Sequence, residues 1–175
     1  EYSFISKKIN KINTISAISK DADNIEKTNN DNFYAFTQQN NVFIYNNKKI
    51  TQVTNEANKD IVCGIAVHRN EFGIVKGLFW SPNYNKLAFY RMDQTMVTDY
   101  PIIHWDGKPA TNENIKYPFA GEKSHEVTLG VFDIASGKTI YIQTGEPKEQ
   151  YLTNIAWSPD EKYIYIRSEE HTSEL

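Results

Sequence analysis

The sequence predicts an all-β fold: a partial β-propeller of about three to four blades, each a four-stranded antiparallel sheet, truncated at both ends. Aromatic residues make up 13% of the chain, with eleven Tyr and nine Phe, which is typical of strand-rich proteins. The turn Trp-Ser-Pro occurs twice, at Trp80 and at Trp157, and a strand pattern follows each copy. A strand–turn–strand unit also recurs, at residues 33–54 and 129–144. Four strands per repeat of about 40–45 residues is the pattern of a propeller blade.

The first half of the chain contains the clearest run of short strands. Residues 1–30 hold one apolar candidate, Tyr2–Ile5, and a weaker alternating run, Ile9–Ile18. The segment 21–32 is polar and rich in turn-forming residues, so we predict no strand there. A meander of three strands joined by polar turns follows, with its strands predicted at residues 33–37, 42–46 and 50–54.

The next strands surround the first Trp-Ser-Pro turn. We predict strands over Ile61–Val67, over Ile74–Trp80 and over residues 86–92. Pro82 and Asn83 end the middle strand, because proline cannot donate a backbone hydrogen bond and asparagine favours turns. Since Trp80 and Trp157 occupy the same place in two repeats, we interpret both as packing between blades.

A long insertion, residues 93–126, separates two strands of the second blade. A loop of this length in a compact domain is usually functional or disordered. Its aromatic residues favour packing over disorder. Tyr100, Trp105 and Tyr117 are candidates to line a substrate cavity, although packing within the loop is the preferred interpretation.

Composition excludes several classes of function. The net charge is −3 with both signs interspersed, so nothing indicates nucleic acid or an anionic membrane surface as a partner. No apolar run approaches the roughly 18 residues of a membrane helix. Cys63 is the only cysteine, so the chain forms no internal disulfide, and we expect it to be a small buried apolar residue.

No cofactor or metal site is predicted. The sequence has no glycine-rich phosphate loop and no His-Glu-x-x-His motif. His68, His104 and His125 share no ligand spacing with one another or with Cys63. The G-x-S-x-G nucleophile elbow is also missing, so we expect no catalytic residue within this chain.

Both ends suggest a fragment. The chain starts at Glu1 rather than Met, as expected if it begins inside a gene. Residues Arg167–Leu175, RSEEHTSEL, are the in-frame translation of a widely used sequencing adapter. We therefore expect a propeller fragment at residues 1–166, followed by a read-through segment at 167–175 that is not native.

One acidic residue stands out, Glu71 in the stretch HRNEFGIVKGLFWSP. Gly73 and Gly77 give the backbone around it conformational freedom. Taken alone, Glu71 reads as an exposed acid beside a glycine turn. Arg69, two positions earlier, reads as a solvated cation or as a salt-bridge partner of Glu71.

Longer stretches change that interpretation. The strings HRNEFGI, LAFYRMDQTMV, YPFAGEKSHEVTLGVFDIASGKTIYIQTGEPKEQ and NIAWSPDE together resemble the N-terminal propeller of the dipeptidyl peptidase IV branch of the prolyl oligopeptidase superfamily. Within that branch they are most similar to bacterial prolyl tripeptidyl aminopeptidase. The resemblance covers most of Asn32–Ile166 and is loose over the first thirty residues.

The resemblance implies a serine-type aminopeptidase whose Ser-Asp-His triad lies in a C-terminal α/β-hydrolase domain outside this chain. The residue matching the acid that grips the free N-terminus of the peptide is Glu71, with Arg69 and Asn70 as possible support. Dipeptidyl peptidase IV has adjacent glutamates here, whereas this chain has one acid. The resemblance therefore favours release of proline-ending tripeptides over Xaa-Pro dipeptides.

Further expectations follow from the same resemblance. The implied partners are the peptide substrate and the hydrolase domain, and a homodimer is possible. The implied location is the periplasm or the cell surface. The competing class is a non-catalytic propeller that acts as a scaffold or binding module.

Overall fold

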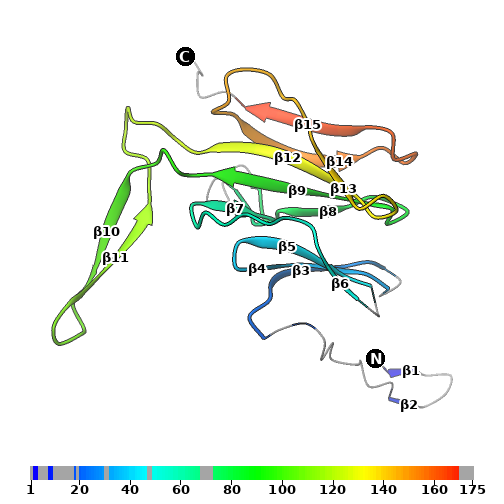
Figure 1. Ribbon diagram of the computed structural model, residues 1–175, viewed down its shortest axis with the longest axis horizontal. Coiled ribbons are helices and arrows are strands. Elements are labelled where there is room, and N and C mark those ends of the chain that lie inside the picture. Colours follow the sequence, from blue (N-terminus) through cyan, green and yellow to red (C-terminus); the bar gives the residue numbers. More distant parts are fainter. Residues whose placement is uncertain are drawn as a thin grey trace.

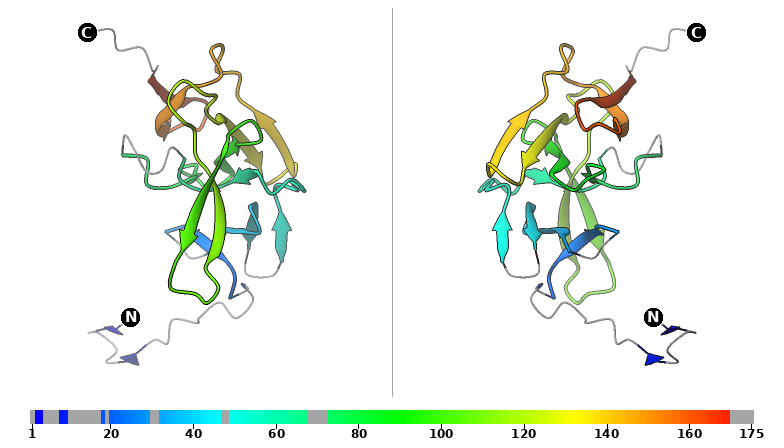
Figure 2. Two further views of the ribbon diagram at one scale, coloured as in Figure 1. Left: turned by 90° about the vertical axis from the view of Figure 1, so that its left-hand side faces the viewer. Right: turned by 90° about the vertical axis from the view of Figure 1, so that its right-hand side faces the viewer.

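The computed structural model describes residues 2–3, 8–9, 18, 20–29, 32–46, 49–67 and 73–169, and within these ranges it is built from strands without an α-helix. The strands form small antiparallel sheets that follow one another along the chain (Figure 1). The same succession of sheets can be followed in the side views (Figure 2), whereas the insertion hairpin is seen apart from the sheets in Figure 1. The predicted fold class, a partial β-propeller, is confirmed.

The first complete blade is a four-stranded meander in the order β3-β4-β5-β6. Its strands are β3 (Asp23–Lys27), β4 (Tyr34–Gln38), β5 (Asn41–Tyr45) and β6 (Ile50–Gln52). The three strands predicted between residues 33 and 54 correspond to β4, β5 and β6. Strand β3 was not predicted, because its sequence is polar. Four of its five residues are exposed, so it lacks the apolar alternation of a buried strand.

The second blade has a divided first strand. Both β7 (Ile61–Cys63) and β8 (Leu78–Trp80) pair with the same edge of β9 (Lys86–Asp93), which is followed in the sheet by β12 (Glu126–Asp133) and β13 (Lys138–Tyr141). The strands predicted over Ile61–Val67 and Ile74–Trp80 are therefore shorter than expected. Gly64 ends β7 with a positive φ of 76°.

A third blade begins with the hairpin of β14 (Tyr151–Trp157) and β15 (Ile164–Glu169). The described residues thus form two complete blades, this half blade and a short hairpin of β1 (Tyr2–Ser3) and β2 (Lys8–Ile9), which agrees with a propeller of three to four blades truncated at both ends. Arg167–Glu169 continue β15 and pair with β14.

The Trp-Ser-Pro turns have the same hydrogen bonds in both copies. The amide of Ser81 donates to Lys86 O at 3.0 Å, and the amide of Ser158 donates to Tyr163 O at 2.9 Å. In each turn the serine Oγ accepts a bond from the same downstream residue, at 3.0 Å and 2.9 Å. Tyr84 and Glu161, three positions after the two serines, both have positive φ, at 61° and 57°.

A third copy of this turn, without the Trp-Ser-Pro sequence, lies in the first blade. The amide of Thr28 donates to Phe33 O at 3.0 Å, and Thr28 Oγ1 accepts from the amide of Phe33 at 3.2 Å. Lys27 stands where the other copies have Trp, and Thr28 stands where they have Ser. Within the polar segment where no strand was predicted, β3 is thus the first strand of a blade, and Thr28 begins the turn that follows it.

The tryptophans join neighbouring blades, as predicted. Trp80 Nε1 donates to the carbonyl of Glu26 on β3, and Trp157 Nε1 donates to the carbonyl of Phe79 on β8, each at 3.1 Å. Since each acceptor belongs to the preceding blade's first strand, the first strands β3, β8 and β14 lie next to one another. A hydrogen bond of 2.5 Å from Tyr90 Oη to Leu152 O adds a second link between β9 and β14.

Two apolar clusters fill the spaces between the sheets. One joins the first and second blades around Val42, Leu78 and Phe89. The other joins the second and third blades around Tyr90, Leu129 and Leu152. The described residues contain no helix long and apolar enough to cross a membrane.

Candidate functional site

The candidate site begins at the break between β7 and β8. The chain leaves the first strand of the second blade at Gly64 and returns to it at Gly77, and both glycines lie opposite a single residue, Tyr90. We refer to residues 64–77 as the excursion. The amide of Gly64 donates to Tyr90 O at 2.8 Å, and the amide of Tyr90 donates to Gly77 O at 3.1 Å. The excursion is therefore closed at its base by the backbone of one residue of β9.

The base of the excursion requires glycine. A Cβ on Gly77 would lie 2.1 Å from the carbonyl oxygen of Ile65, and a Cβ on Gly64 would lie 2.7 Å from Val42 Cγ2. The incoming and outgoing segments thus cross at a distance that side chains would prevent. The expected backbone freedom is confirmed for Gly73, whose φ is 73°, whereas Gly77 is required because of the close approach to Ile65.

The predicted site residues Glu71, Arg69 and Asn70 lie outside the described residues, as does His68. The structure describes the two anchors that flank them. Val67 is fully buried and Ile74 is 5% exposed, and both belong to the cluster between the second and third blades. The segment that carries Glu71 is therefore attached to the core on both sides.

A cavity of about 300 Å³ opens beside the excursion. Its walls come from four parts of the chain: the start of the excursion, the end of β9, the base of the insertion and the first residue of the third blade. The lining residues are Ile65, Ala66, Met92, Gln94, Lys116, Tyr117, Pro118, Ser124, His125 and Tyr151. We refer to this space as the interblade cavity.

The insertion is mostly a two-stranded arm. Strands β10 (Asp99–His104) and β11 (Thr111–Lys116) pair from end to end and extend away from the sheets (Figure 1). The base of the arm holds the ring cluster of Tyr100, Tyr117 and Phe119, with centroids 5.7–6.5 Å apart. Packing within the insertion is confirmed for these aromatic residues.

The candidates for cavity lining separate in the structure. Tyr117 lines the interblade cavity, whereas Tyr100 packs behind it. Trp105 is 79% exposed in the turn at the far end of the arm, so it neither packs nor lines the cavity.

Lys116 fixes the base of the arm to the blades. Its Nζ donates to Val97 O at 3.0 Å and lies 3.2 Å from Asp99 Oδ1 and 3.8 Å from Asp60 Oδ2. Asp60 belongs to the connection between the first and second blades. The cavity wall formed by the insertion is thereby tied to the body of the protein.

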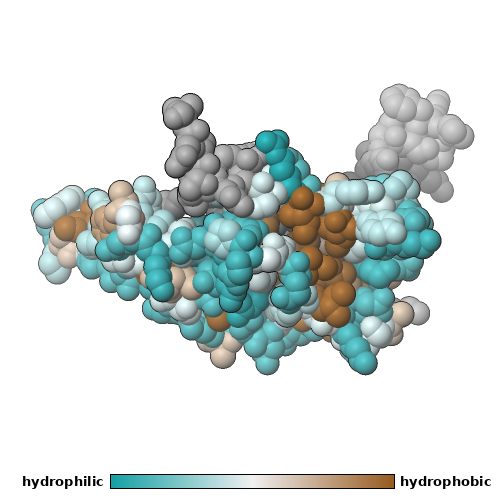
Figure 3. Space-filling view, turned by 90° about the horizontal axis from the view of Figure 1, so that it is seen from above, coloured by the Kyte–Doolittle hydropathy of each residue, from teal (hydrophilic) through white to brown (hydrophobic). Residues whose placement is uncertain are grey.

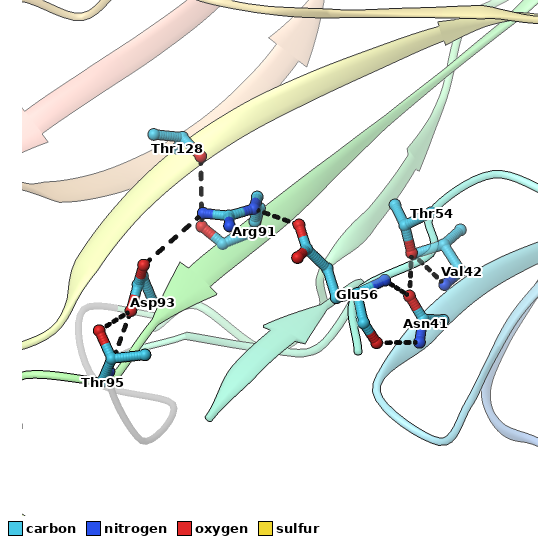
Figure 4. A network of polar contacts seen from close by, with 8 residues as sticks. All are labelled: Asn41, Val42, Thr54, Glu56, Arg91, Asp93, Thr95 and Thr128. Atoms are coloured by element: carbon cyan, nitrogen blue, oxygen red, sulfur yellow. Dashed lines mark hydrogen bonds and ion pairs between the residues drawn. The ribbon is translucent and has the colours of Figure 1, made fainter. Parts of the chain in front are cut away.

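A polar network also holds the connection between the first and second blades (Figure 4). The buried side chain of Asn41 accepts from the amide of Glu56 at 2.7 Å and donates to the carbonyl of Glu56 at 3.1 Å. Arg91 Nε, on β9, then binds Glu56 Oε1 at 2.7 Å. The first blade is thus joined to β9 next to Tyr90, the residue that closes the excursion.

Burial controls the titration of two residues in this region. Cys63 is fully buried, and burial raises the pKa of its thiol to about 11, although a hydrogen bond with Thr54 opposes the shift. Burial likewise raises the pKa of Tyr90, so its hydroxyl stays protonated and donates to Leu152. The prediction that Cys63 is a small buried residue is confirmed.

Sequence reasoning missed the parts that close the site. Tyr90 has the sequence context of an ordinary strand residue. Only the pairing register shows that it lies between Arg91, the partner of Cys63, and Phe89, the partner of Leu78. Lys116 carried no local motif. Among the described residues, no group of three or more His, Cys, Asp or Glu side chains is arranged to hold a metal ion.

Comparison with known proteins gives consistent matches. The family described as the dipeptidyl peptidase IV (DPP IV) N-terminal region matches residues 1–170. A protein assigned as dipeptidyl-aminopeptidase B from Tuber melanosporum is 30% identical over 167 residues, which covers 81% of this chain and 18% of the relative. One from Pyrenophora tritici-repentis is 24% identical, with 80% and 18% covered.

Solved structures agree with the fold. A crystal structure of a protein assigned as a dipeptidyl aminopeptidase IV from Bacteroides ovatus superposes with a TM-score of 0.77 at 45% identity, covering 86% of this chain and 20% of that one. Porphyromonas gingivalis dipeptidyl peptidase 4 superposes with a TM-score of 0.75 at 25% identity, covering 82% and 21%. The chain therefore spans about a fifth of the length of its relatives.

The matched residues include both complete blades, the divided first strand and the interblade cavity. The chain belongs to the family of dipeptidyl peptidase IV N-terminal regions.

Proposed function

We propose that this chain is the substrate-gating propeller part of a serine exopeptidase that releases proline-ending tripeptides from free peptide N-termini. In this proposal Glu71 binds the α-ammonium group of the substrate, with Arg69 and Asn70 positioning it. The triad belongs to a C-terminal α/β-hydrolase domain outside the chain, and no cofactor is used.

The observation that carries the proposal is the excursion at residues 64–77. It leaves the first strand of its blade, and the first strands of adjacent blades lie next to one another through the Trp80 and Trp157 hydrogen bonds. In a propeller the blades surround a central channel. In this proposal the acid between the two anchors of the excursion meets a peptide that enters the channel.

The chemistry suits an N-terminal anchor. A peptide α-amino group has a pKa near 7.7–8.0, so it is mostly cationic at neutral pH. A carboxylate facing it makes a charge-assisted hydrogen bond. The distance from that carboxylate to the nucleophile then determines how many residues are removed, so Glu71 acts as a ruler rather than as a catalytic group.

The length of the released peptide has two candidate values. The single acid in His68-Arg69-Asn70-Glu71 favours tripeptides, since it lacks the second glutamate of dipeptidyl peptidase IV. The relatives named above are dipeptidyl enzymes, which favours Xaa-Pro dipeptides as the second candidate.

The decisive experiment compares Ala-Ala-Pro and Ala-Pro p-nitroanilides as substrates of the full-length enzyme. We expect the higher kcat/KM on the tripeptide substrate. Faster cleavage of the dipeptide substrate would reject the tripeptidyl proposal in favour of the dipeptidyl one.

The non-catalytic alternative has a separate test. If the full-length gene continues into further blades but ends without a G-x-S-x-G elbow, the chain belongs to a scaffold or binding propeller, and the peptidase proposal fails. The same full-length protein would test the proposed periplasmic or cell-surface location by fractionation, and the proposed homodimer by sedimentation.

A further inference from the structure

We propose that a groove on the wall of the propeller channel binds short peptides that end in an apolar residue with a free carboxylate. This inference deepens the proposed function and rests on it for the identity of the peptide, because a released proline-ending tripeptide has this chemistry. The groove itself is built from residues that the structure describes.

The groove lies where the first strands of three blades end. A space of about 640 Å³ follows the ends of β3, β8 and β14 and the turns after β3 and β8, and we refer to it as the channel groove. These strands adjoin through the Trp80 and Trp157 hydrogen bonds, so they converge on the side that faces the channel of a propeller. The insertion arm follows the other end of β9, so the channel groove lies at the channel mouth opposite the arm.

One side of the channel groove is apolar and mostly aromatic. Its members are Phe79, Trp80, Pro82, Tyr84, Ile155 and Trp157. Pro82 is exposed and the other five are half-buried, so part of each side chain is open to a ligand. Aromatic-lined grooves bind proline residues of extended peptides. This side of the groove therefore suits a proline or another apolar residue.

The other side of the channel groove is polar and carries a net positive charge. Its members are Glu26, Lys27, Asn29, Lys76 and Ser81. Two lysines against one glutamate leave one positive charge, which complements a peptide carboxylate. Lys76 Nζ lies 3.5 Å from Glu26 Oε2 and 5.5 Å from the centroid of the Phe79 ring, so this ammonium group stands where the polar and aromatic sides meet. A carboxylate bound to Lys76 would place its own apolar side chain against the rings.

The aromatic side is held in place by contacts between blades. The indole of Trp80 donates to Glu26 O at 3.1 Å, and its ring packs edge-on against Tyr84, at 6.4 Å between centroids. Tyr84 Oη in turn accepts a hydrogen bond of 3.1 Å from the amide of Asn29 in the first blade. Since these rings are fixed before a peptide arrives, little ordering opposes binding.

The test measures the Kd of the peptide Ala-Ala-Pro by equilibrium dialysis, on full-length enzyme treated with diisopropyl fluorophosphate to block its catalytic serine. The amide of the same peptide lacks the carboxylate and should bind roughly threefold more weakly, as expected for a partly exposed ion pair. Lys76→Met should weaken binding of the acid by a similar factor and leave binding of the amide unchanged, because both changes remove the same ion pair. Tyr84→Ala removes a ring and should lower the preference for Ala-Ala-Pro over Ala-Ala-Gly at least about twofold.

Lys162→Met is the matched control, because the Lys162 side chain is 72% exposed and does not line the channel groove. It should bind the acid and the amide as the wild type does. Equal affinity of the wild type for acid and amide, or equal losses for both peptides in Lys76→Met with a wild-type circular dichroism spectrum, would overturn the inference. Labelling by diisopropyl fluorophosphate and cleavage of p-nitroanilides report the proposed function separately. If both are absent, the proposed function fails, whereas binding of Ala-Ala-Pro that depends on Lys76 would still support the groove.

Discussion

Replacing Trp157 by Phe should weaken the contact between the second and third blades at a defined place. The substitution keeps an aromatic ring but removes the indole N–H, which donates to Phe79 O at 3.1 Å. Phe79 itself packs edge-on against Tyr90, at 5.4 Å between centroids, so the affected carbonyl lies beside the residue that closes the 64–77 excursion.

The magnitude follows from the hydrogen bond. A neutral hydrogen bond contributes about 0.5–1.5 kcal/mol, and an acceptor left without its partner costs about 1–3 kcal/mol. Because 1.4 kcal/mol corresponds to a tenfold change in an equilibrium constant, the loss of about 1–3 kcal/mol should accelerate amide exchange in β8 by roughly 5- to 150-fold. Local opening of this kind is measured by native-state hydrogen exchange with mass spectrometry on the full-length protein.

Matched variants make this prediction specific. Trp80→Phe should accelerate exchange in β3 instead, because Trp80 donates to Glu26 O. Tyr163→Phe, at an exposed side chain, should change neither strand. Unchanged exchange in β8 of Trp157→Phe, or equal acceleration across the whole domain, would refute the blade-to-blade role of the tryptophans.

Three further predictions concern other residues and the isolated chain. With its thiol pKa near 11 and its side chain fully buried, Cys63 should resist iodoacetamide at pH 8 in the native protein and react after unfolding, whereas rapid native labelling would contradict its burial. Burial opposes ionisation of Glu161, but hydrogen bonds from Ser81, the amide of Asn83 and Asn85 lower the pKa of its carboxyl group. The carboxylate should therefore stabilise the fold fully above the unfolded pKa of about 4.3. This contribution should be lost as the pH falls through the lower pKa of the folded state. Denaturation of wild type and Glu161→Gln should therefore differ at pH 7 and converge near pH 3, and a constant difference would contradict this. The chain expressed alone should aggregate. Its upper side in Figure 1, on which β15 lies, carries a band of apolar surface (Figure 3), and Tyr163 and Tyr165 are more than half exposed. A monomer with a sharp cooperative melt would contradict this prediction.

Periodic features of the sequence predicted much of the fold. The meander between residues 33 and 54 and the two Trp-Ser-Pro turns follow from local turn chemistry and from alternation of side chains, which act over a few residues. These features were confirmed because each is stabilised by hydrogen bonds within its own repeat, such as those of Ser81 and Ser158.

Strand β3 was missed because it lacks both of these local features. Its residues are mostly exposed, and its turn has Lys27 and Thr28 where the other copies have Trp and Ser. The three copies share a side-chain hydroxyl that accepts a hydrogen bond from a backbone amide, and Thr supplies this hydroxyl as well as Ser. Aligning Thr28 with Ser81 and Ser158 was the signal that would have revealed the third copy.

The candidate site depended on contacts that local patterns do not encode. Gly77 was expected to be important, but its crossing with Ile65 is visible only in three dimensions. The closure of the excursion by Tyr90 and the attachment of the arm by Lys116 join residues far apart in the sequence. Glu71, which was chosen by resemblance, remains a prediction.

The measurement that tests the central claim most directly is the preference of the full-length enzyme for a free N-terminus, with and without Glu71. A charge-assisted hydrogen bond contributes about 1.5–3 kcal/mol, so Glu71→Gln should lower kcat/KM roughly 10- to 150-fold on a free peptide substrate, mainly through a higher KM. The same variant should have little effect on an N-acetylated substrate, and Glu146→Gln, at an exposed acid, should match the wild type on both. Equal kcat/KM of wild type and Glu71→Gln on the free substrate would contradict the account.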